Sequence, residues 1–324
     1  MVLRMASPLT FHSSFGGTWL DRSDAAEMID WKLDHALIDD FEADQLRLWI
    51  TNGYIILPGA VPETLCAELA RDLAEIWRFG SESALMQDPT APPGTGASVD
   101  VSQPADRMRL VDLYGCSWPA LSVLTVPAIV RFLTMVFEMP PLLFQGLTFE
   151  KGSGQGLHQD TAYVVVDSPM EMAASWVALE DVIEGSGELT YISGSHRLPD
   201  FRFSDRFKHW SPERDGDEQH DQWAQHIARK SEEFGLHRKS FLPKRGDAFI
   251  WSADLVHGGS PVVDPALTRR SMVGHYCPVA RDPHYFSYQQ DRLKVSCGEA
   301  FASSSYYDVR SLPAEGQRAA AQPV

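Results

Sequence analysis

Short runs of strand-forming residues fill the second half of the chain, and each run ends near glycine, proline, aspartate or serine. These runs are residues 142–151, 174–182, 188–193, 247–251 and 269–277. The first half instead shows helical patterns that start near Asp40, Pro62 and Pro127, with one short strand over residues 54–57. Helices followed by a strand-rich half predict a mainly β fold, a double-stranded β-helix (jelly roll) buttressed by N-terminal helices.

The domain organisation follows from the lack of any linker, repeat or low-complexity block in the 324 residues. We expect an N-terminal arm (1–40), a single domain (41–290) and a C-terminal tail (291–324). Residues 81–104 are rich in Pro, Gly, Ser and Ala, which predicts a long loop. Residues 199–240 form an insertion dense in charged and aromatic side chains, with a helix around 218–233, and we expect it to be lid-like.

Charge and cysteine content exclude several classes of function. The formal net charge of −16 repels phosphate backbones and anionic lipid surfaces, so we expect no nucleic-acid partner. Four cysteines without a CxxC pair argue against a disulfide framework or a thiolate metal site. No apolar run approaches eighteen residues and no signal-peptide pattern is present. We therefore expect no membrane span, a cytoplasmic location and a small-molecule substrate, whereas the oligomeric state stays open.

Two separated segments predict a metal site. Alternate residues of an extended strand project to the same side, so His158 and Asp160 in His158-Gln159-Asp160 can reach one point. His257 lies in a later β-prone run that ends at two glycines. Two imidazoles and one carboxylate suit non-haem Fe(II). The same set is workable for zinc, so a zinc hydrolase is an alternative.

An arginine pair follows His257. Arg269 and Arg270 are adjacent on a predicted strand and point to opposite sides, so only one can enter the barrel. An arginine inside the barrel would be suited to binding a carboxylate through two hydrogen bonds. The residues on the side of Arg269 are Ser271, Val273 and His275, and those on the side of Arg270 are Met272, Gly274 and Tyr276. Both sets are mixed, so alternation leaves the choice open.

The chain resembles the phytanoyl-CoA dioxygenase family of Fe(II)/2-oxoglutarate-dependent oxygenases over roughly residues 50–280. The motifs that carry the resemblance are His158-Gln159-Asp160, Trp176, Gly194-Ser195-His196, Gly246-Asp247, His257-Gly258 and Arg269. The resemblance implies a jelly-roll core, iron held by His158, Asp160 and His257, and 2-oxoglutarate bound through Arg269. It also implies that Trp176 lines the cosubstrate pocket and that Ser260 hydrogen-bonds the distal carboxylate. Gln145, on the strand before the glycine-rich turn, is a further candidate for cosubstrate contact.

The reaction that this resemblance implies consumes O2 and 2-oxoglutarate and releases succinate and CO2. We expect hydroxylation of an unactivated C–H bond of a natural-product or lipid-like molecule. Asp160 favours this over halogenation, because a glycine or alanine there would open a coordination site for halide. Desaturation, epoxidation and cyclisation stay open, because they differ from hydroxylation in the orientation of the substrate and not in the metal ligands. The alternatives are a non-catalytic jelly-roll binding module with a vestigial metal site and the zinc hydrolase, which would leave Arg269 without a role.

Overall fold

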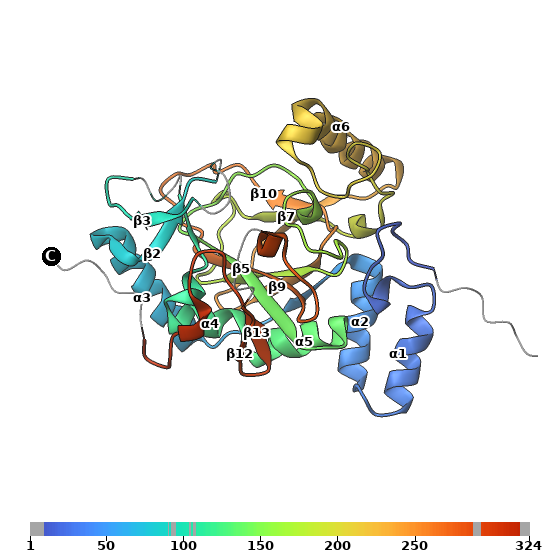
Figure 1. The fold of residues 1–324 in the computed structure, drawn as a ribbon, viewed down its shortest axis with the longest axis horizontal. Coiled ribbons are helices and arrows are strands. Elements are labelled where there is room, and N and C mark those ends of the chain that lie inside the picture. Colours follow the sequence, from blue (N-terminus) through green and yellow to red (C-terminus); the bar gives the residue numbers. More distant parts are fainter. Residues whose placement is uncertain are drawn as a thin grey trace, which may run out of the picture.

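The computed structural model describes residues 10–89, 91, 95–103, 105, 108–287 and 293–317 (Figure 1). Its helices are α1 (Ala25–Asp34), α2 (Asp40–Asn52), α3 (Glu63–Phe79), α4 (Trp118–Leu124), α5 (Pro127–Phe137) and α6 (Pro212–Glu233). Its strands are β1 (Tyr54–Leu57), β2 (Ser81–Gln87), β3 (Ala97–Val99), β4 (Arg109–Val111), β5 (Pro141–Phe149), β6 (Ala173–Ala178), β7 (Leu189–Ile192), β8 (Arg238–Phe241), β9 (Ala248–Ser252), β10 (His257–Gly259), β11 (Ser271–Pro278), β12 (Val295–Cys297) and β13 (Ala300–Ala302).

The strands form two sheets. The larger has the order β1-β9-β6-β11-β5-β4-β2-β3, and the smaller has the order β10-β7-β8. Neighbours in both orders are antiparallel, as in β1 with β9 and β7 with β8, while β13 lies parallel to β5. The prediction of a jelly-roll core, buttressed by helices from the N-terminal half of the chain, is confirmed.

Alternation along the central strands divides the core into two layers. On β9, Ala248 and Ile250 face the large apolar cluster formed with the helices, whereas Phe249 and Trp251 join Trp176 in a second cluster. This second cluster also contains Leu189 and Tyr191 of β7, so it fills the space between the two sheets. A strand buried on both faces must place apolar side chains in both layers. The second layer contains the site described below.

The prediction of a long loop over residues 81–104 is wrong for residues 81–87 and 97–99, which form β2 and β3. Leu85, Met86 and Gln87 of β2 pair with Val111, Leu110 and Arg109 of β4, so a distant segment supplies the hydrogen bonds. Strand formation depends on such partners more than on local preference, and the composition of this segment therefore misled the prediction. Residues 90, 92–94 and 104 of the predicted loop lie outside the described residues.

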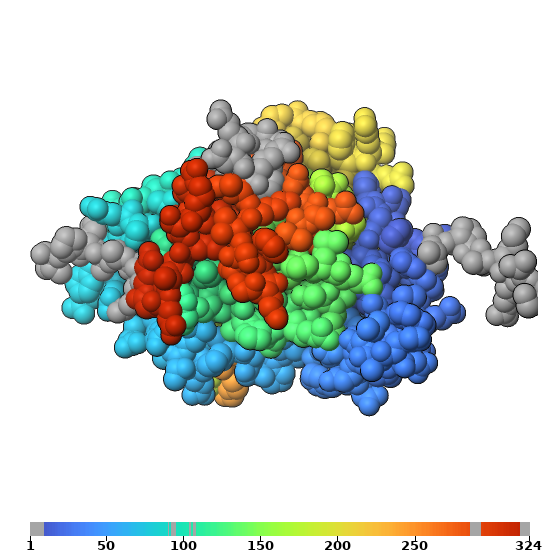
Figure 2. Space-filling view, turned by 60° about the horizontal axis from the view of Figure 1, so that its bottom comes forward, coloured from blue at the N-terminus to red at the C-terminus, as the bar shows by residue number. Residues whose placement is uncertain are grey.

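Both ends of the chain contribute regular elements within the described residues. The segment 1–40, predicted to be an N-terminal arm, contains α1, whose Ala25 and Ile29 are buried. Within residues 291–324, β13 pairs with Leu142 and Leu143 of β5, and Figure 2 shows this C-terminal segment, in red, lying across the green part of the chain. Residues 1–9, 291–292 and 318–324 lie outside the described residues.

The insertion over residues 199–240 contains α6, which begins six residues before the predicted helix and has a non-helical backbone at Gly216. No single helix among the described residues is long and apolar enough to cross a membrane, and only α4 and α5 taken together, at a bend of 46°, pass such a test on length and composition.

Candidate active site

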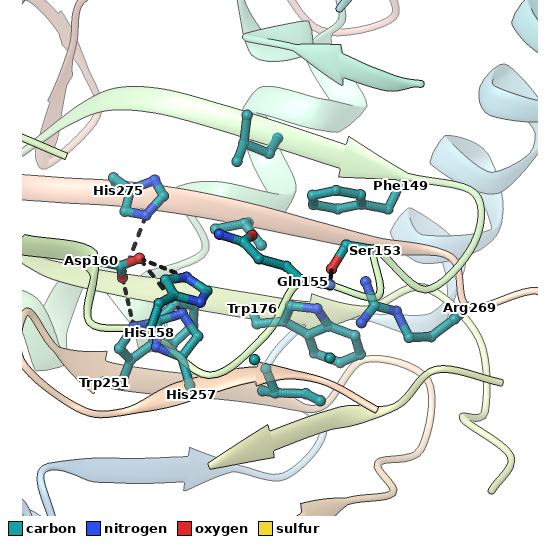
Figure 3. Close-up of a pocket in the computed structure, with 15 residues that line it drawn as sticks. Phe149, Ser153, Gln155, His158, Asp160, Trp176, Trp251, His257, Arg269 and His275 are labelled. Atoms are coloured by element: carbon teal, nitrogen blue, oxygen red, sulfur yellow. Dashed lines mark hydrogen bonds and ion pairs between the residues drawn. The ribbon is translucent and has the colours of Figure 1, made fainter. Parts of the chain in front are cut away.

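Three side chains from two segments converge at one end of a pocket between the sheets (Figure 3). One ligand atom from each of His158, Asp160 and His257 lies within 4.8 Å of the other two, and all three residues are buried. Asp160 Oδ1 lies 3.7 Å from His158 Nε2 and 3.5 Å from His257 Nε2. The sequence prediction that these residues meet at one point therefore agrees with their positions.

The backbone itself brings the two histidines together. His158 and His257 form an isolated antiparallel bridge, in which each backbone N–H donates to the other residue's carbonyl at 2.8 and 2.9 Å. Gln159 is extended (φ −111°, ψ 134°), so His158 and Asp160 project to the same side while Gln159 projects to the other. Beyond Gln159 the chain turns into a short 3-10 helix, Asp160–Ala162, instead of continuing as a strand.

Hydrogen bonds to backbone carbonyls fix both imidazole rings. His158 Nδ1 donates to Gly156 O at 2.8 Å, and His257 Nδ1 donates to Leu255 O at 2.9 Å. A ring that donates from Nδ1 presents the lone pair of Nε2. Both Nε2 atoms lie near Asp160 with their lone pairs free to bind a cation shared with the carboxylate, as a metal ligand requires.

The protonation states of the ligands also suit a cation. Burial lowers the pKa of His257 to about 4, so its imidazole is neutral at physiological pH. Burial opposes ionisation of Asp160, but the surrounding histidines outweigh it and hold the pKa of Asp160 well below its usual value. A neutral imidazole and an ionised carboxylate are the forms that bind metal.

Two residues that the sequence prediction did not assign contact Asp160. Trp251 Nε1 donates to Asp160 Oδ2 at 2.8 Å. His275 Nε2 lies 3.6 Å from the same oxygen, and neither ring nitrogen of buried His275 has a hydrogen-bond partner among the described residues. His275 lies on the same side of its strand as Arg269, so the alternation pattern could have identified it.

Arg269 occupies the other end of the pocket. In Figure 3 its guanidinium faces the pocket, with Trp176 and Gln155 between it and the three ligands. Its Nη1 donates to Gly187 O at 2.9 Å and its Nη2 lies 3.5 Å from Ser271 Oγ, while Nε has no partner among the described residues. Burial lowers the pKa of Arg269 to about 10, so the side chain remains a cation at physiological pH. A buried cation with spare donors is a binding site for an anion.

Arg270 points away from the pocket. Its guanidinium forms ion pairs with Glu150 at 2.7 Å and with Glu180 at 3.4 Å, and it is half-buried. Its donors are therefore used on the outer side of the sheet. The choice between the two arginines, which alternation left open, falls on Arg269 as the one that lines the pocket.

Of the other three residues predicted to contact the cosubstrate, one lines this pocket and two do not. Trp176 lines it, with its indole ring 5.6 Å from the Arg269 guanidinium carbon. Ser260 is buried beside it, and its backbone N–H donates to Glu188 O at 2.8 Å, but Ser260 does not line the pocket. Gln145 lies on β5 opposite His275 and also does not line the pocket. The roles of Ser260 and Gln145 stay predictions.

The pocket fits a metal ion together with an anionic organic molecule. The three ligand atoms supply nitrogen and oxygen donors on one side only, which leaves the pocket side open. Arg269 and the indole N–H of Trp176, which has no hydrogen-bond partner in the part of the chain that the structure describes, supply donors for a carboxylate at the far end. Enzymes that use iron with 2-oxoglutarate are the class that this barrel and this donor set define.

The chain belongs to the phytanoyl-CoA dioxygenase (PhyH) family, whose model matches residues 49–271. This range contains every residue of the pocket described above except Val273 and His275. No curated protein matches the chain.

Three solved structures with the same fold are described as α-ketoglutarate-dependent enzymes or as complexes with 2-oxoglutarate. The epimerase SnoN in complex with Fe3+, α-ketoglutarate and nogalamycin RO is 20% identical, with a TM-score of 0.58 over 81% of this chain and 98% of that one. The carbocyclase SnoK from nogalamycin biosynthesis is 13% identical, with a TM-score of 0.53 over 82% and 97%. EctD from S. alaskensis with 2-oxoglutarate and 5-hydroxyectoine is 15% identical, with a TM-score of 0.50 over 75% and 77%.

Proposed function

We propose that this iron- and 2-oxoglutarate-dependent enzyme hydroxylates an unactivated C–H bond of a small natural-product or lipid-like molecule. The observation that carries the proposal is the pairing of a three-ligand centre with a buried arginine whose Nε has no hydrogen-bond partner among the described residues. A zinc hydrolase would need the first feature but not the second, and a vestigial site would not be expected to retain both.

In this proposal His158, Asp160 and His257 hold the iron, and Arg269 holds the distal carboxylate of 2-oxoglutarate. Iron and 2-oxoglutarate, when bound, supply the oxidising chemistry with O2 and release succinate and CO2. The chain itself orients the cosubstrate and limits the access of water. Arg269 is buried and several apolar side chains line the pocket that it shares, so its attraction for a carboxylate is screened less than at the surface. These pocket residues include Leu147, Phe149, Trp176, Leu189 and Val273.

Asp160 supports oxygen transfer over halogenation, because its carboxylate fills the position that a halide would need. The same fold carries other outcomes, since SnoN is an epimerase and SnoK a carbocyclase. Product mass separates these outcomes: hydroxylation adds one oxygen atom, ring closure removes two hydrogens, and epimerisation leaves the mass unchanged.

We further propose that residues 41–290 form one catalytic domain and that the insertion 199–240 covers the substrate side as a lid. Support comes from Tyr163, whose ring lies 5.7 Å from that of His158 and also contacts Trp210 and Trp223 of the insertion. The cytoplasmic location predicted from the sequence stays a prediction.

The decisive experiment is anaerobic addition of Fe(II) and 2-oxoglutarate to the purified protein. We expect a weak visible charge-transfer band, and succinate release once O2 and a substrate from a metabolite library are added. His158→Ala should abolish both signals and leave the circular dichroism spectrum unchanged, because the ring contributes a ligand rather than core packing.

His237→Ala is the matched control, since His237 is exposed in the segment before β8. The absence of the band from wild-type protein that has taken up Fe(II), or full turnover by His158→Ala, would contradict the proposal.

A further inference from the structure

A buried ion pair joins the insertion to the segment that leads into His257. Lys208 Nζ lies 2.5 Å from Asp254 Oδ2 and 3.0 Å from Asp200 Oδ1. The side chains of Lys208 and Asp254 are only 3% and 2% exposed, which is rare for charged residues. Burial opposes the charge on Lys208, but Asp254 and Asp200 outweigh it and raise the pKa of Lys208 above its usual value.

Asp254 also contacts both sides of the metal-ligand motif. Its Oδ1 accepts a hydrogen bond from Thr161 Oγ1 at 2.5 Å, and its backbone carbonyl accepts one from Gln159 Nε2 at 2.9 Å. Gln159 and Thr161 are the two neighbours of Asp160, and Asp254 itself precedes His257 by three residues. One residue therefore connects the segments that carry all three ligands.

The insertion contacts the same motif at two further points. Trp223 Nε1 donates to Gln159 Oε1 at 3.4 Å, and the backbone N–H of Trp210 donates to Ala162 O at 3.0 Å. Trp223 is buried, so this contact excludes water. The insertion thus packs directly on the turn that presents Asp160.

We propose that Lys208 and Asp254 are positioning residues for the metal centre, so that the insertion is a structural part of that centre as well as its cover. The inference rests on the metal-ligand assignment of the proposed function. A buried ion pair gives little net stability compared with apolar residues of similar size, so stability alone is a weak reason for it. Fixing the neighbours of Asp160 is a reason that the observed contacts supply.

The test measures Fe(II) affinity by anaerobic calorimetry in Lys208→Met and Asp254→Asn, at a temperature where circular dichroism shows both variants folded. Loss of groups that orient metal ligands typically weakens metal binding roughly 10- to 100-fold, and we expect a loss in this range. Lys244→Met is the matched control, because Lys244 forms an exposed ion pair with Asp181 at 3.0 Å, and its affinity should equal that of the wild type.

A second pair of variants keeps the test decisive if Lys208→Met fails to fold. Thr161→Val removes only the hydroxyl that reaches Asp254, and it should weaken Fe(II) binding, whereas Thr161→Ser should restore it. A role limited to fold stability would lower the unfolding midpoint without changing the affinity of the folded protein.

Wild-type affinity in a folded Lys208→Met variant, or in Thr161→Val, would overturn the inference and leave the proposed function standing. Failure of the wild-type protein itself to bind Fe(II) would overturn the proposed function and this inference with it.

Discussion

Arg269 is the residue whose surroundings say most about the pocket. A guanidinium has five N–H donors, and the described contacts of Arg269 use two of its three nitrogens. The rings of Phe149 and Trp176 lie 5.7 and 5.6 Å from its central carbon, and the side chain is buried, so little water reaches the guanidinium. A cation desolvated in this way is stabilised when a carboxylate joins it.

Replacing Arg269 should therefore weaken 2-oxoglutarate binding. Truncating one partner of a buried charge pair costs about 2–5 kcal/mol, so Arg269→Leu should raise the dissociation constant for 2-oxoglutarate at least roughly 30-fold. Calorimetric titration of the metal-loaded protein measures this, and Fe(II) affinity should change little.

Arg270→Leu is the control at the neighbouring position. It breaks the ion pairs with Glu150 and Glu180 on the outer side of the sheet, so it should lower stability and leave 2-oxoglutarate affinity within twofold. A larger loss of 2-oxoglutarate affinity in Arg270→Leu than in Arg269→Leu would place the anion site on the outer side of the sheet and contradict this assignment.

The two arginines also show what the sequence alone could predict about single residues. Alternation correctly separated their directions, but both rows of the strand are mixed in polarity. The positions of Glu150 and Glu180, which come from other parts of the chain, hold Arg270 on the outer side and so leave Arg269 facing the pocket. The contacts of Asp160 with Trp251 and His275 are similarly non-local. Alternation could place His275 on the side of Arg269, but it could not show that either residue contacts Asp160.

The junction between α2 and β1 depends on one glycine. Gly53 ends α2 in the left-handed conformation (φ 78°), and its backbone N–H donates to Trp49 O at 2.8 Å. A Cβ at Gly53 would lie 2.4 Å from Nδ1 of His196, whose ring is buried against the turn. This close approach brings the short helix Ser195–Arg197, after β7, against the helical layer.

Gly53→Ala should therefore destabilise the protein more than a glycine replacement at an open turn. The positive φ costs about 1 kcal/mol and the clash with a buried ring adds about 1–3 kcal/mol. Gly59→Ala has a similar φ of 59° but no neighbour within 4 Å, so it should show only the first cost. Urea unfolding of both variants measures the difference, and equal losses would contradict the role of His196.

The elements that the sequence predicted well are those with strong periodicity or strong local end signals. Helix α2 starts at Asp40, where the sequence predicted its start, although the N-cap is Asp39, which accepts from Glu42 N at 2.8 Å. Gly53 ends the helix, and both end signals are local. Strands β2 and β3 and helix α1 lack such signals and form because distant partners bury or pair them. Their absence from the prediction has this physical cause.

At the scale of the whole molecule, two buried titratable groups that do not line the pocket should have opposite effects on how stability depends on pH. Burial lowers the pKa of His196 to about 3, and burial raises the pKa of Asp112 to about 7. Asp112 accepts hydrogen bonds from Gly146 N at 2.6 Å and Ser304 Oγ at 2.7 Å, so it ties the C-terminal segment to β5.

These two groups should give opposite slopes in a pH titration of stability. Below pH 6.5 the unfolded chain binds a proton at His196 that the folded chain rejects until about pH 3, so stability falls as the pH falls. Above pH 3.8 the unfolded chain ionises Asp112 while the folded chain keeps it neutral up to about pH 7, so stability falls as the pH rises. Each slope is about 1.4 kcal/mol per pH unit at most.

Urea unfolding of the metal-free protein from pH 4.5 to 7.5, roughly the span between these transitions, separates the two contributions. Relative to wild type, His196→Gln should gain stability as the pH is lowered, and Asp112→Asn should gain stability as the pH is raised. Parallel profiles for all three proteins would show that neither group titrates differently on folding.

The reciprocal backbone pairing of His158 with His257 has a consequence for how the protein acquires its metal. In many small metal-binding domains the ion gathers ligands from a floppy polypeptide, and binding and folding are one event. Here the backbone bridge between His158 and His257 sets the spacing of the two imidazoles before any metal binds. Iron would bind to a preformed site, because the conformational entropy needed to bring the two imidazoles together is already lost when the barrel folds.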